Sequence, residues 1–186
     1  MPLAELDPIA ALIVIDLQRG IVAMPTAQPI ADVVQRSAEL ARAFRRHNLP
    51  VVLVNVTAAA PGRTDIRRAV RDFPPDWTEL VPELDRQPTD HLVSKQRVGA
   101  FLGTDLDAYL RSRGVTQVIL AGVATTAGVE STARSAADLG YHVVFAADAM
   151  TDMSAENHRH AIEKIFPRFG QCDSTSAILD ALNKRA

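Results

Sequence analysis

Short runs of aliphatic residues alternate with longer segments of helical period along this chain, and that alternation restricts the folds open to it. The runs are Ala11–Leu17, Val51–Val56, His91–Ser94, Gln117–Ala121 and Tyr141–Ala146, with a weaker sixth near Gly170–Asp173. Strands that are apolar on both faces are typical of a parallel sheet covered by helices on both sides. The helices expected between them are Ile30–His47, Thr104–Arg113, Thr126–Leu139, Ala155–Phe166 and Thr175–Lys184. This order predicts an α/β fold, a doubly wound three-layer α/β/α sandwich.

Residues that favour helix ends support these boundaries. Gly114 and Gly140 follow two of the expected helices, where glycine takes the left-handed conformation that ends a helix without steric cost. Thr104 precedes Asp107 by three residues, a spacing typical of a capping box. We therefore expect Thr104 to cap the helix that begins there.

The composition is that of an ordinary globular protein. The 186 residues fit a single domain over 1–186. Twenty Lys and Arg against 22 Asp and Glu give a net charge of −2, and aromatics make up 5%, so neither a nucleic-acid nor a membrane partner is expected. No apolar run approaches the roughly 18 residues of a membrane span, and residues 1–7 lack the basic start of a secretory signal, so we expect a cytoplasmic protein. The single cysteine, Cys172, excludes an internal disulfide.

Polar residues stand at the carboxyl ends of the expected strands, where open α/β sheets bind their ligands. Asp16 lies near the end of the first run, Lys95 ends the third, and Asp148 follows the fifth. A carboxylate and an ammonium buried together shift each other's pKa and can serve proton transfer. The plainer alternatives are an Asp16 that bonds backbone N–H groups and a solvated Lys95. For Asp148, a structural role in a turn before Thr151 is favoured.

The segment Gly122–Gly128 follows the fourth run and leads into a helix. Its glycines permit a tight turn and the close approach of a ligand to the helix N-terminus, whose free N–H groups favour an anion or oxyanion. An ordinary strand-to-helix turn packed with small residues is the alternative.

The one long irregular segment is Thr57–Asp90, and loops of that length in a compact domain are usually functional. It contains Arg63, Arg67 and Arg68. These arginines either bind carboxylates of a substrate or form a solvated basic loop.

Several ordered motifs in this chain resemble the isochorismatase-like, or cysteine hydrolase, superfamily, which includes isochorismatases, nicotinamidases and N-carbamoylsarcosine amidohydrolase. The motifs are Ala11–Gln18 (ALIVIDLQ), Asn55–Thr57, Pro61–Thr64, Ser94–Phe101 (SKQRVGAF) and Gly122–Arg134 (GVATTAGVESTAR). The resemblance covers nearly the whole chain and implies a mainly parallel six-stranded sheet between helical layers. It also implies a homodimer or a homotetramer.

In the amidase branches of that superfamily, an Asp at the first strand, a Lys at the third and a Cys after the fourth form the catalytic trio. Asp16 and Lys95 match the first two, but the Gly-Val-x-Thr-x-x-Cys motif ends in Gly128 here. Covalent amide hydrolysis needs a nucleophile that glycine lacks. Cys172 lies far along the chain, and the hydroxyls of Thr125 and its neighbour are weak nucleophiles without an adjacent base. A cysteine amidase is therefore not expected.

A nicotinamidase is not expected either, because those enzymes carry a metal site with histidines after the second strand. Here that stretch reads Asn55-Val-Thr-Ala-Ala-Ala-Pro61. His158 and His160 are two apart, so on a helix they face differently and make a poor chelate. We expect no metal and no other cofactor.

Isochorismatases in the superfamily also have glycine at the position of Gly128, and they are understood to hydrolyse a vinyl ether with the first-strand Asp as proton donor. The resemblance thus implies a small-molecule hydrolase with Asp16 and Lys95 as catalytic residues. The substrate contacts expected from it are Gly128, Ala124, Thr125, Arg63 and Phe101. Lys95 favours an ionised Asp16 and burial favours a protonated one, which leaves the charge of Asp16 open. The alternative is a catalytically inactive ligand-binding or assembly protein on the same fold.

Overall fold

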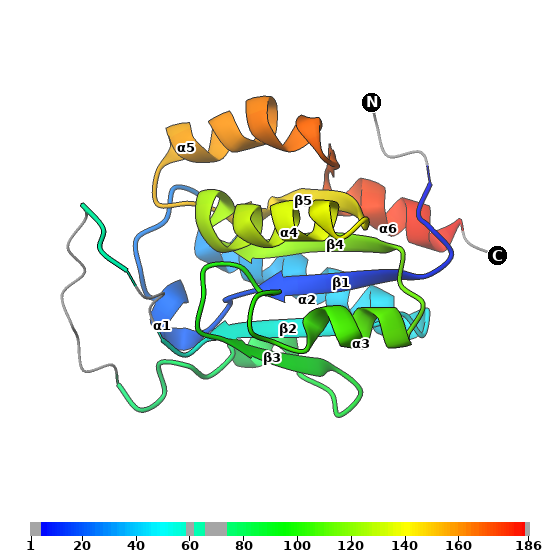
Figure 1. Ribbon diagram of the computed structural model, residues 1–186, viewed down its shortest axis with the longest axis horizontal. Coiled ribbons are helices and arrows are strands. Elements are labelled where there is room, and N and C mark those ends of the chain that lie inside the picture. The colour runs from blue at the N-terminus through cyan, green and yellow to red at the C-terminus, as the bar shows by residue number, and fades with distance from the viewer. Residues whose placement is uncertain (1–4, 59–61, 66–73, 185–186) are drawn as a thin grey trace.

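The computed structural model describes residues 5–58, 62–65 and 74–184, and a six-stranded sheet forms its centre (Figure 1). In chain order the strands are β1 (Ala10–Ile15), β2 (Val51–Val56), β3 (His91–Lys95), β4 (Gln117–Val123), β5 (His142–Thr151) and β6 (Gln171–Asp173). They lie in the order β3-β2-β1-β4-β5-β6, and every neighbouring pair is parallel. The expected parallel sheet is confirmed.

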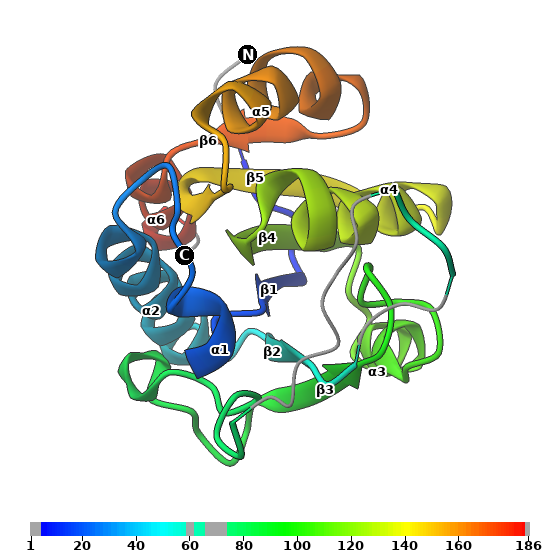
Figure 2. The same cartoon turned by 90° about the vertical axis from the view of Figure 1, so that its left-hand side faces the viewer.

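Helices cover both faces of the sheet. They are α1 (Arg19–Val22), α2 (Ile30–Arg46), α3 (Leu106–Ser112), α4 (Glu130–Asp138), α5 (Ala155–His160) and α6 (Thr175–Asn183). Short 3₁₀ or π turns complete the set: η1 (Pro82–Leu84), η2 (Thr125–Val129), η3 (Ala161–Ile165) and η4 (Phe166–Arg168). Helices α2 and α6 pack on one face, and α3 and α4 pack on the other (Figure 2). This arrangement is the expected three-layer α/β/α sandwich.

The central strand β1 is buried on both sides, as its apolar run predicts. Leu12 and Val14 belong to the core under α2 and α6, whereas Ala11, Ile13 and Ile15 belong to the core under α3 and α4. Burying an aliphatic side chain of this kind stabilises the fold by roughly 1.5–3 kcal/mol. Two separate cores therefore hold β1 in place and fix the position of the residue that follows it.

The strand order places β1 beside β4 at the centre of the sheet. The chain continues from β1 to β2 on one side and from β4 to β5 on the other, so the direction of winding reverses between them. Ile15 pairs with Gly122 at the carboxyl edge of these two strands. Folds of this order bind ligands beyond that edge, which is where Asp16 lies.

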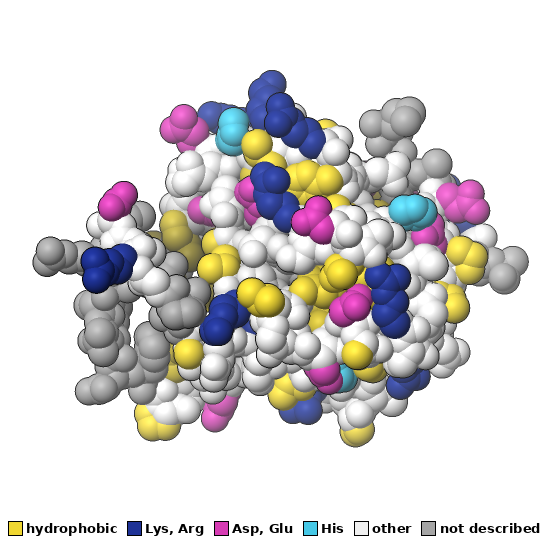
Figure 3. Space-filling view, in the orientation of Figure 1, with side chains coloured by type: hydrophobic (Ala, Val, Ile, Leu, Met, Phe, Trp, Pro, Cys, Tyr) yellow, Lys and Arg dark blue, Asp and Glu magenta, His cyan; other side chains and the backbone are white. Residues whose placement is uncertain are grey.

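The surface carries charges of both signs. Lys, Arg, Asp and Glu side chains are interspersed over the face seen in Figure 3, in keeping with a net charge of −2. This face therefore has no broad basic surface for a polyanion. Among the described residues, no helix combines the length and the apolar character needed to cross a bilayer.

Asp148 lies inside β5, which continues to Thr151, so the prediction of a turn before Thr151 is wrong. Its Oδ1 accepts hydrogen bonds from the N–H and the hydroxyl of Thr175, at 2.7 and 2.8 Å. Its Oδ2 lies 3.4 Å from Nε of Arg36. The apolar pattern ends at Ala146, but partners from α6 and α2 satisfy the carboxylate within the strand.

The helix boundaries are mostly as expected. Gly114 and Gly140 have φ of 69° and 87°, which confirms both as helix ends. The expected helix over 126–139 begins instead as the π turn η2, and the one over 155–166 divides into α5, η3 and η4, where Pro167 lacks a backbone donor. Helix α1 and turn η1 were not predicted.

The capping box at Thr104 is wrong. Helix α3 begins at Leu106, and the Thr104 hydroxyl donates to the Ala100 carbonyl at 2.5 Å. The Asp107 carboxylate accepts a hydrogen bond from the Tyr141 hydroxyl at 2.7 Å. The Thr104 hydroxyl does accept from the Leu106 N–H at 3.3 Å, but among the described residues no reciprocal bond joins Asp107 to Thr104, so the contact is not a capping box.

Candidate active site

A buried ion pair joins the ends of the first and third strands. Asp16 follows β1 directly, and Lys95 is the last residue of β3. Lys95 Nζ lies 2.7 Å from Asp16 Oδ2, and the two side chains expose only 3% and 8% of their surface. Because β2 lies between β1 and β3, the lysine side chain spans the end of β2 to reach the carboxylate. The structure thus brings together the two residues predicted to be catalytic.

The backbone turns out of the sheet at Asp16. Its φ is 52°, a left-handed conformation that Asp tolerates better than most residues. The Asp16 N–H still donates to the Val54 carbonyl at 2.9 Å, and the Asp16 carbonyl accepts from the Gln18 N–H at 2.9 Å. The carboxylate is therefore presented just beyond the last paired residue of β1.

Burial raises the pKa of the Asp16 carboxyl to about 6, although the charge and the hydrogen bond of Lys95 lower it. Desolvation penalises the charged carboxylate more than Lys95 favours it. The sequence left open whether Lys95 or burial has the larger effect on the Asp16 pKa, and burial has the larger effect. A substantial fraction of Asp16 is protonated at weakly acidic pH.

The two oxygens of the Asp16 carboxyl have different surroundings. Oδ2 accepts from the Lys95 ammonium, which also donates to the Arg97 carbonyl at 3.3 Å. Oδ1 is buried and has no hydrogen-bond partner among the residues that the structure describes. Since a positive charge disfavours a proton on Oδ2, the protonated carboxyl carries its hydrogen on Oδ1. An unpaired polar atom is costly to bury, so Oδ1 is the oxygen of this carboxyl that still lacks a partner.

Gly128 lies against Asp16 within η2. A Cβ at this position would stand 2.9 Å from Ile15 Cγ2 and 3.3 Å from both Asp16 Oδ2 and the Val123 carbonyl oxygen. Close packing therefore favours glycine here. A side chain at position 128 would press on the strand end that carries the carboxylate.

The hydroxyls of the two threonines in η2 bond to α5 and to the residue that follows β5. Thr125 is fully buried, and its Oγ1 lies 2.8 Å from Nδ1 of His158. Thr126 donates from its N–H and its hydroxyl to Oδ2 of Asp152, at 2.8 and 2.7 Å. Burial lowers the pKa of His158, which favours a neutral imidazole. A base does lie beside Thr125, contrary to expectation, but the hydroxyl is enclosed and serves to hold η2 in place.

Among the described residues, none of the other predicted substrate contacts hydrogen-bonds to the ion pair, and their role stays a prediction. Ala124 joins β4 to η2 and is half-buried. Phe101 is 9% exposed and lies in the core under α3 and α4, and its expected contact with a substrate stays a prediction. Arg63 is exposed, and its guanidinium has no hydrogen bond or ion pair within the described part of the chain. Arg67 and Arg68 lie outside the described residues.

Gln18 was missed by sequence inspection, although it lies two residues after Asp16. Its side chain is fully buried and bonds to backbone groups of Val56 and Trp77. A polar residue at the end of an otherwise apolar run was the available signal.

The single thiol lies apart from this region, on β6. Within the described ranges, no three His, Cys, Asp or Glu residues lie together so that they could hold a metal ion. Cys172 is half-buried on β6, and its Sγ lies 3.8 Å from the Ile162 carbonyl. Burial raises the pKa of this thiol to about 11, so it is protonated and weakly nucleophilic at neutral pH.

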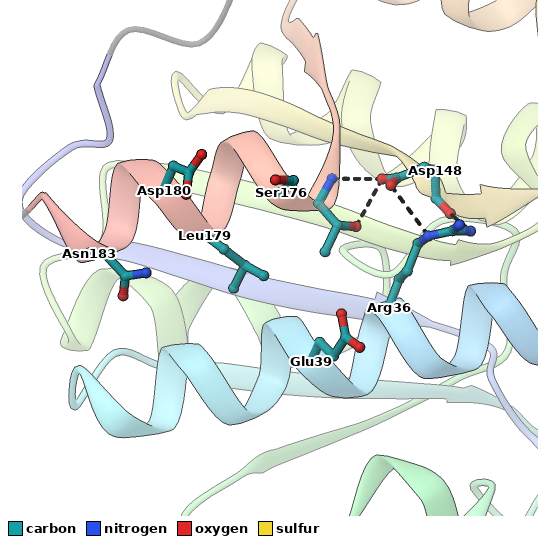
Figure 4. A pocket seen from close by; sticks show the side chains of 8 residues that line it. Arg36, Glu39, Asp148, Ser176, Leu179, Asp180 and Asn183 are labelled. Atoms are coloured by element: carbon teal, nitrogen blue, oxygen red, sulfur yellow. Dashed lines mark hydrogen bonds and ion pairs between the residues drawn. The ribbon is translucent and has the colours of Figure 1, made fainter.

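A separate cavity of about 450 Å³ lies between α2 and α6 (Figure 4). Its described lining residues are Arg36, Glu39, Asp148, Thr175, Ser176, Leu179, Asp180 and Asn183. Of these only Leu179 is apolar, whereas small-molecule pockets are mostly apolar. Asp148 also pairs with Arg36 and Thr175 inside the cavity. None of the predicted site residues lines it, so the candidate active site stays at Asp16.

Comparison with known proteins gives three findings. Residues 10–177 match the isochorismatase domain. The isochorismatase family protein YwoC of Bacillus subtilis is 42% identical over 177 residues, which cover 91% of this chain and 92% of YwoC. The solved structure of an isochorismatase family protein from Burkholderia thailandensis matches with a TM-score of 0.94 and 42% identity, over 98% of this chain and 99% of that one.

A more distant relative has a named activity. The ureidoacrylate amidohydrolase RutB of Pantoea ananatis is 38% identical over 109 residues, which cover 58% of this chain and 44% of RutB. The isochorismatase domain match, in contrast, spans all six strands and includes Asp16, Lys95 and Gly128. By its domain, its relatives and its fold, this chain belongs to the isochorismatase family.

Proposed function

We propose that this protein hydrolyses a small molecule, a vinyl ether of the isochorismate class, without a covalent enzyme intermediate. One observation carries the proposal: a buried Asp16 carboxyl with a pKa of about 6 is paired with Lys95 beside a residue 128 that has no side chain. A carboxyl with this pKa suits general acid catalysis near neutral pH. Since position 128 offers no nucleophile, the acid has to carry the reaction.

The first step is proton transfer to carbon. Protonated Asp16 delivers the hydrogen on Oδ1 to the terminal carbon of the vinyl ether, and the electron pair of the C=C bond forms the new C–H bond. The ether oxygen stabilises the resulting oxocarbenium ion. Water then adds to the cationic carbon and returns a proton to the Asp16 carboxylate. The hemiketal breaks its C–O bond to give a ketone and an alcohol, so one water is consumed in total.

Lys95 and Gly128 have supporting parts in this reaction. Once Asp16 has given up its proton, the new carboxylate lies 2.7 Å from the Lys95 ammonium, which stabilises the negative charge. Lys95 thus favours the state that follows proton transfer, while burial favours the acid before it. Gly128 lets η2 pack directly against the strand end that carries the carboxyl, because a Cβ there would stand 3.3 Å from Asp16 Oδ2.

Covalent amide hydrolysis is less well supported, although RutB carries an amidohydrolase name. The amidase branches of the family place a thiol at the position that Gly128 occupies. Cys172 does not replace it, because it lies on β6 and burial raises its thiol pKa to about 11. These observations favour acid catalysis by Asp16.

The test is turnover of isochorismate and simpler vinyl ethers in ²H₂O by the wild type and by Asp16→Asn. We expect solvent deuterium in the methyl group of the ketone product. We also expect kcat to be lower in Asp16→Asn by a factor of about 100 or more. Asp32→Asn is the matched control, because Asp32 is exposed on α2. Equal turnover by the wild type and Asp16→Asn would refute Asp16 as the acid.

A catalytically inactive ligand-binding protein is the second candidate, because the nucleophile position of the amidases has lost its side chain. If this candidate is correct, the protein binds the ligand and forms no product from it. Calorimetric titration with isochorismate, run beside the assay, separates the two: heat of binding with no released ketone favours the binding protein.

A further inference from the structure

Gln18 continues the pairing of β1 with β2 beyond the point where the β1 backbone turns away. The backbone ladder ends with Ile15 opposite Val54. Gln18 Oε1 then accepts from the Val56 N–H at 2.7 Å, and Gln18 Nε2 donates to the Val56 carbonyl at 3.1 Å. The carboxamide thus replaces a strand backbone, because it satisfies both polar groups of Val56.

Val56 links Gln18 to the lysine of the ion pair. In the parallel ladder between β2 and β3, Val56 pairs with Lys95. The Lys95 carbonyl also accepts from the Thr57 N–H at 2.9 Å. Lys95 therefore stands on a strand end whose neighbour is held by Gln18, and Asp16 lies two residues before the same glutamine.

The third hydrogen bond of Gln18 holds the segment around Trp77. Gln18 Nε2 donates to the Trp77 carbonyl at 3.0 Å, which also accepts from the Gly20 N–H at 3.1 Å. A Cβ on Gly20 would lie 1.8 Å from Trp77 Cδ1, so the indole packs directly on the Gly20 backbone. Because Gln18 itself is 0% exposed, it acts through these neighbours.

We infer that Gln18 is a positioning residue for the Asp16–Lys95 pair, since its carboxamide holds the ends of β1 and β2 at the separation that permits the 2.7 Å contact. Removing its three hydrogen bonds releases Val56 and, through it, Lys95. Asp16 stays buried, because its own N–H bond to Val54 does not involve Gln18. The inference rests on the proposed function for its effect on turnover, but not for its effect on the ion pair.

The charges around Asp16 make this effect measurable. Lys95 on β3 is the charged group that acts on the carboxyl, and Gly128 of η2, which lies against Asp16 Oδ2, carries no charge. A longer distance to Lys95 removes the influence that lowers the Asp16 pKa, while burial still raises it. The pKa of Asp16 therefore rises when Gln18 no longer holds the strands.

The experiment is a ¹³C carboxyl NMR titration of Asp16 in the wild type, Gln18→Met and Gln35→Met. Methionine keeps the length of the side chain and removes the three hydrogen bonds. Gln35 is exposed on α2 and bonds only to Glu39 among the described residues, so it supplies the matched control. We expect the Asp16 pKa to rise by about half a unit or more in Gln18→Met and to stay unchanged in Gln35→Met.

Turnover of isochorismate provides a second readout. In Gln18→Met, kcat should fall about tenfold with KM little changed, because a misplaced proton donor slows the chemical step more than binding. The pH dependence of kcat should move upward together with the pKa measured by NMR. Circular dichroism shows whether the variant is folded.

An unchanged or lowered Asp16 pKa in folded Gln18→Met overturns the inference. If that variant does not fold, Gln18→Asn takes its place, because its amide is one methylene too short to reach Val56, and the same rise is required of it. The titration needs no substrate. A wild type that turns over no vinyl ether would therefore refute the proposed function, while the NMR result would still decide the role of Gln18.

Discussion

The Asp16 carboxyl owes its chemistry to its immediate surroundings. Burial raises its pKa to about 6 against the opposing effect of Lys95, and its two oxygens are made unequal because only Oδ2 receives the ammonium. Gly128 has no side chain, and close packing requires this because a Cβ there would stand only 2.9 Å from Ile15 Cγ2. At this scale, our proposal of acid rather than nucleophilic catalysis depends on one missing side chain.

Gly128→Cys tests whether the pair of charges is still arranged for catalysis. The new thiol would lie next to Asp16, which can accept its proton, and near Lys95, which stabilises a thiolate. We expect it to react with iodoacetamide near neutral pH about tenfold faster than an ordinary exposed thiol. The crowding at Ile15 should lower the free energy of unfolding by about 1–3 kcal/mol.

The comparison is made in a Cys172→Ser background, so that a single thiol reacts. Ser112→Cys supplies the ordinary thiol, because Ser112 is exposed at the end of α3. If the cysteine at position 128 reacts no faster than that reference, the site is not arranged for catalysis, and the ligand-binding alternative gains support.

Elements are held together here by polar contacts as well as by the two cores. Asp148 in β5 binds the first residue of α6 through Thr175 and lies beside Arg36 of α2. Figure 4 shows these contacts from the side of the cavity. One carboxylate thus connects a strand to two helices of the same layer, which is why a polar residue interrupts the apolar pattern of β5.

Asp148→Ala should lower the free energy of unfolding by about 1–3 kcal/mol, because the N–H and hydroxyl of Thr175 lose a charged acceptor. Urea unfolding followed by circular dichroism measures the change. Asp180→Ala is the matched control, since Asp180 is exposed on α6 and lines the same cavity. A loss of stability that is equal in the two variants would contradict the role of Asp148.

The whole molecule supplies the burial that raises the pKa of Asp16. Asp16 is only 6% exposed, and the order β3-β2-β1-β4-β5-β6 places it where the direction of winding reverses. The membership in the isochorismatase family is shown by the domain match over residues 10–177. The homodimer or homotetramer that the resemblance implies stays a prediction.

Stability should therefore depend on pH through Asp16. The pKa of about 6 in the folded state lies above the unfolded value of 3.8, so the folded protein holds this proton more tightly. The resulting stabilisation is fully present below about pH 4 and is lost as the pH rises through 6, a difference of about 3 kcal/mol.

Asp16→Asn removes this dependence, because asparagine does not titrate. Urea unfolding of both proteins between pH 4 and 7 should show the stability of the variant rising relative to the wild type by about 2–3 kcal/mol. A difference between the two proteins that is constant over this range would contradict the raised pKa.

Much of the architecture could be predicted from local patterns. Runs such as Val51–Val56 became strands, and Gly114 ends its helix as expected, because periodicity and glycine conformation are properties of a few neighbouring residues. The failures have the opposite origin. At the expected capping box Asp107 bonds to Tyr141, and at the expected turn Asp148 bonds to Thr175, both of which are remote in the sequence.

By itself, the sequence determined the alternation of strands and helices, the resemblance to a family, and the presence of Asp16, Lys95 and Gly128 at matching motif positions. These are local or ordered features of the chain. Only the tertiary structure decided that the two charges meet at 2.7 Å and that burial outweighs Lys95 in setting the Asp16 pKa. It also decided that the Gln18 carboxamide bonds to Val56 at the end of β2. The reason is that desolvation and contact distance depend on every element packed around a group, and no short stretch of sequence contains them.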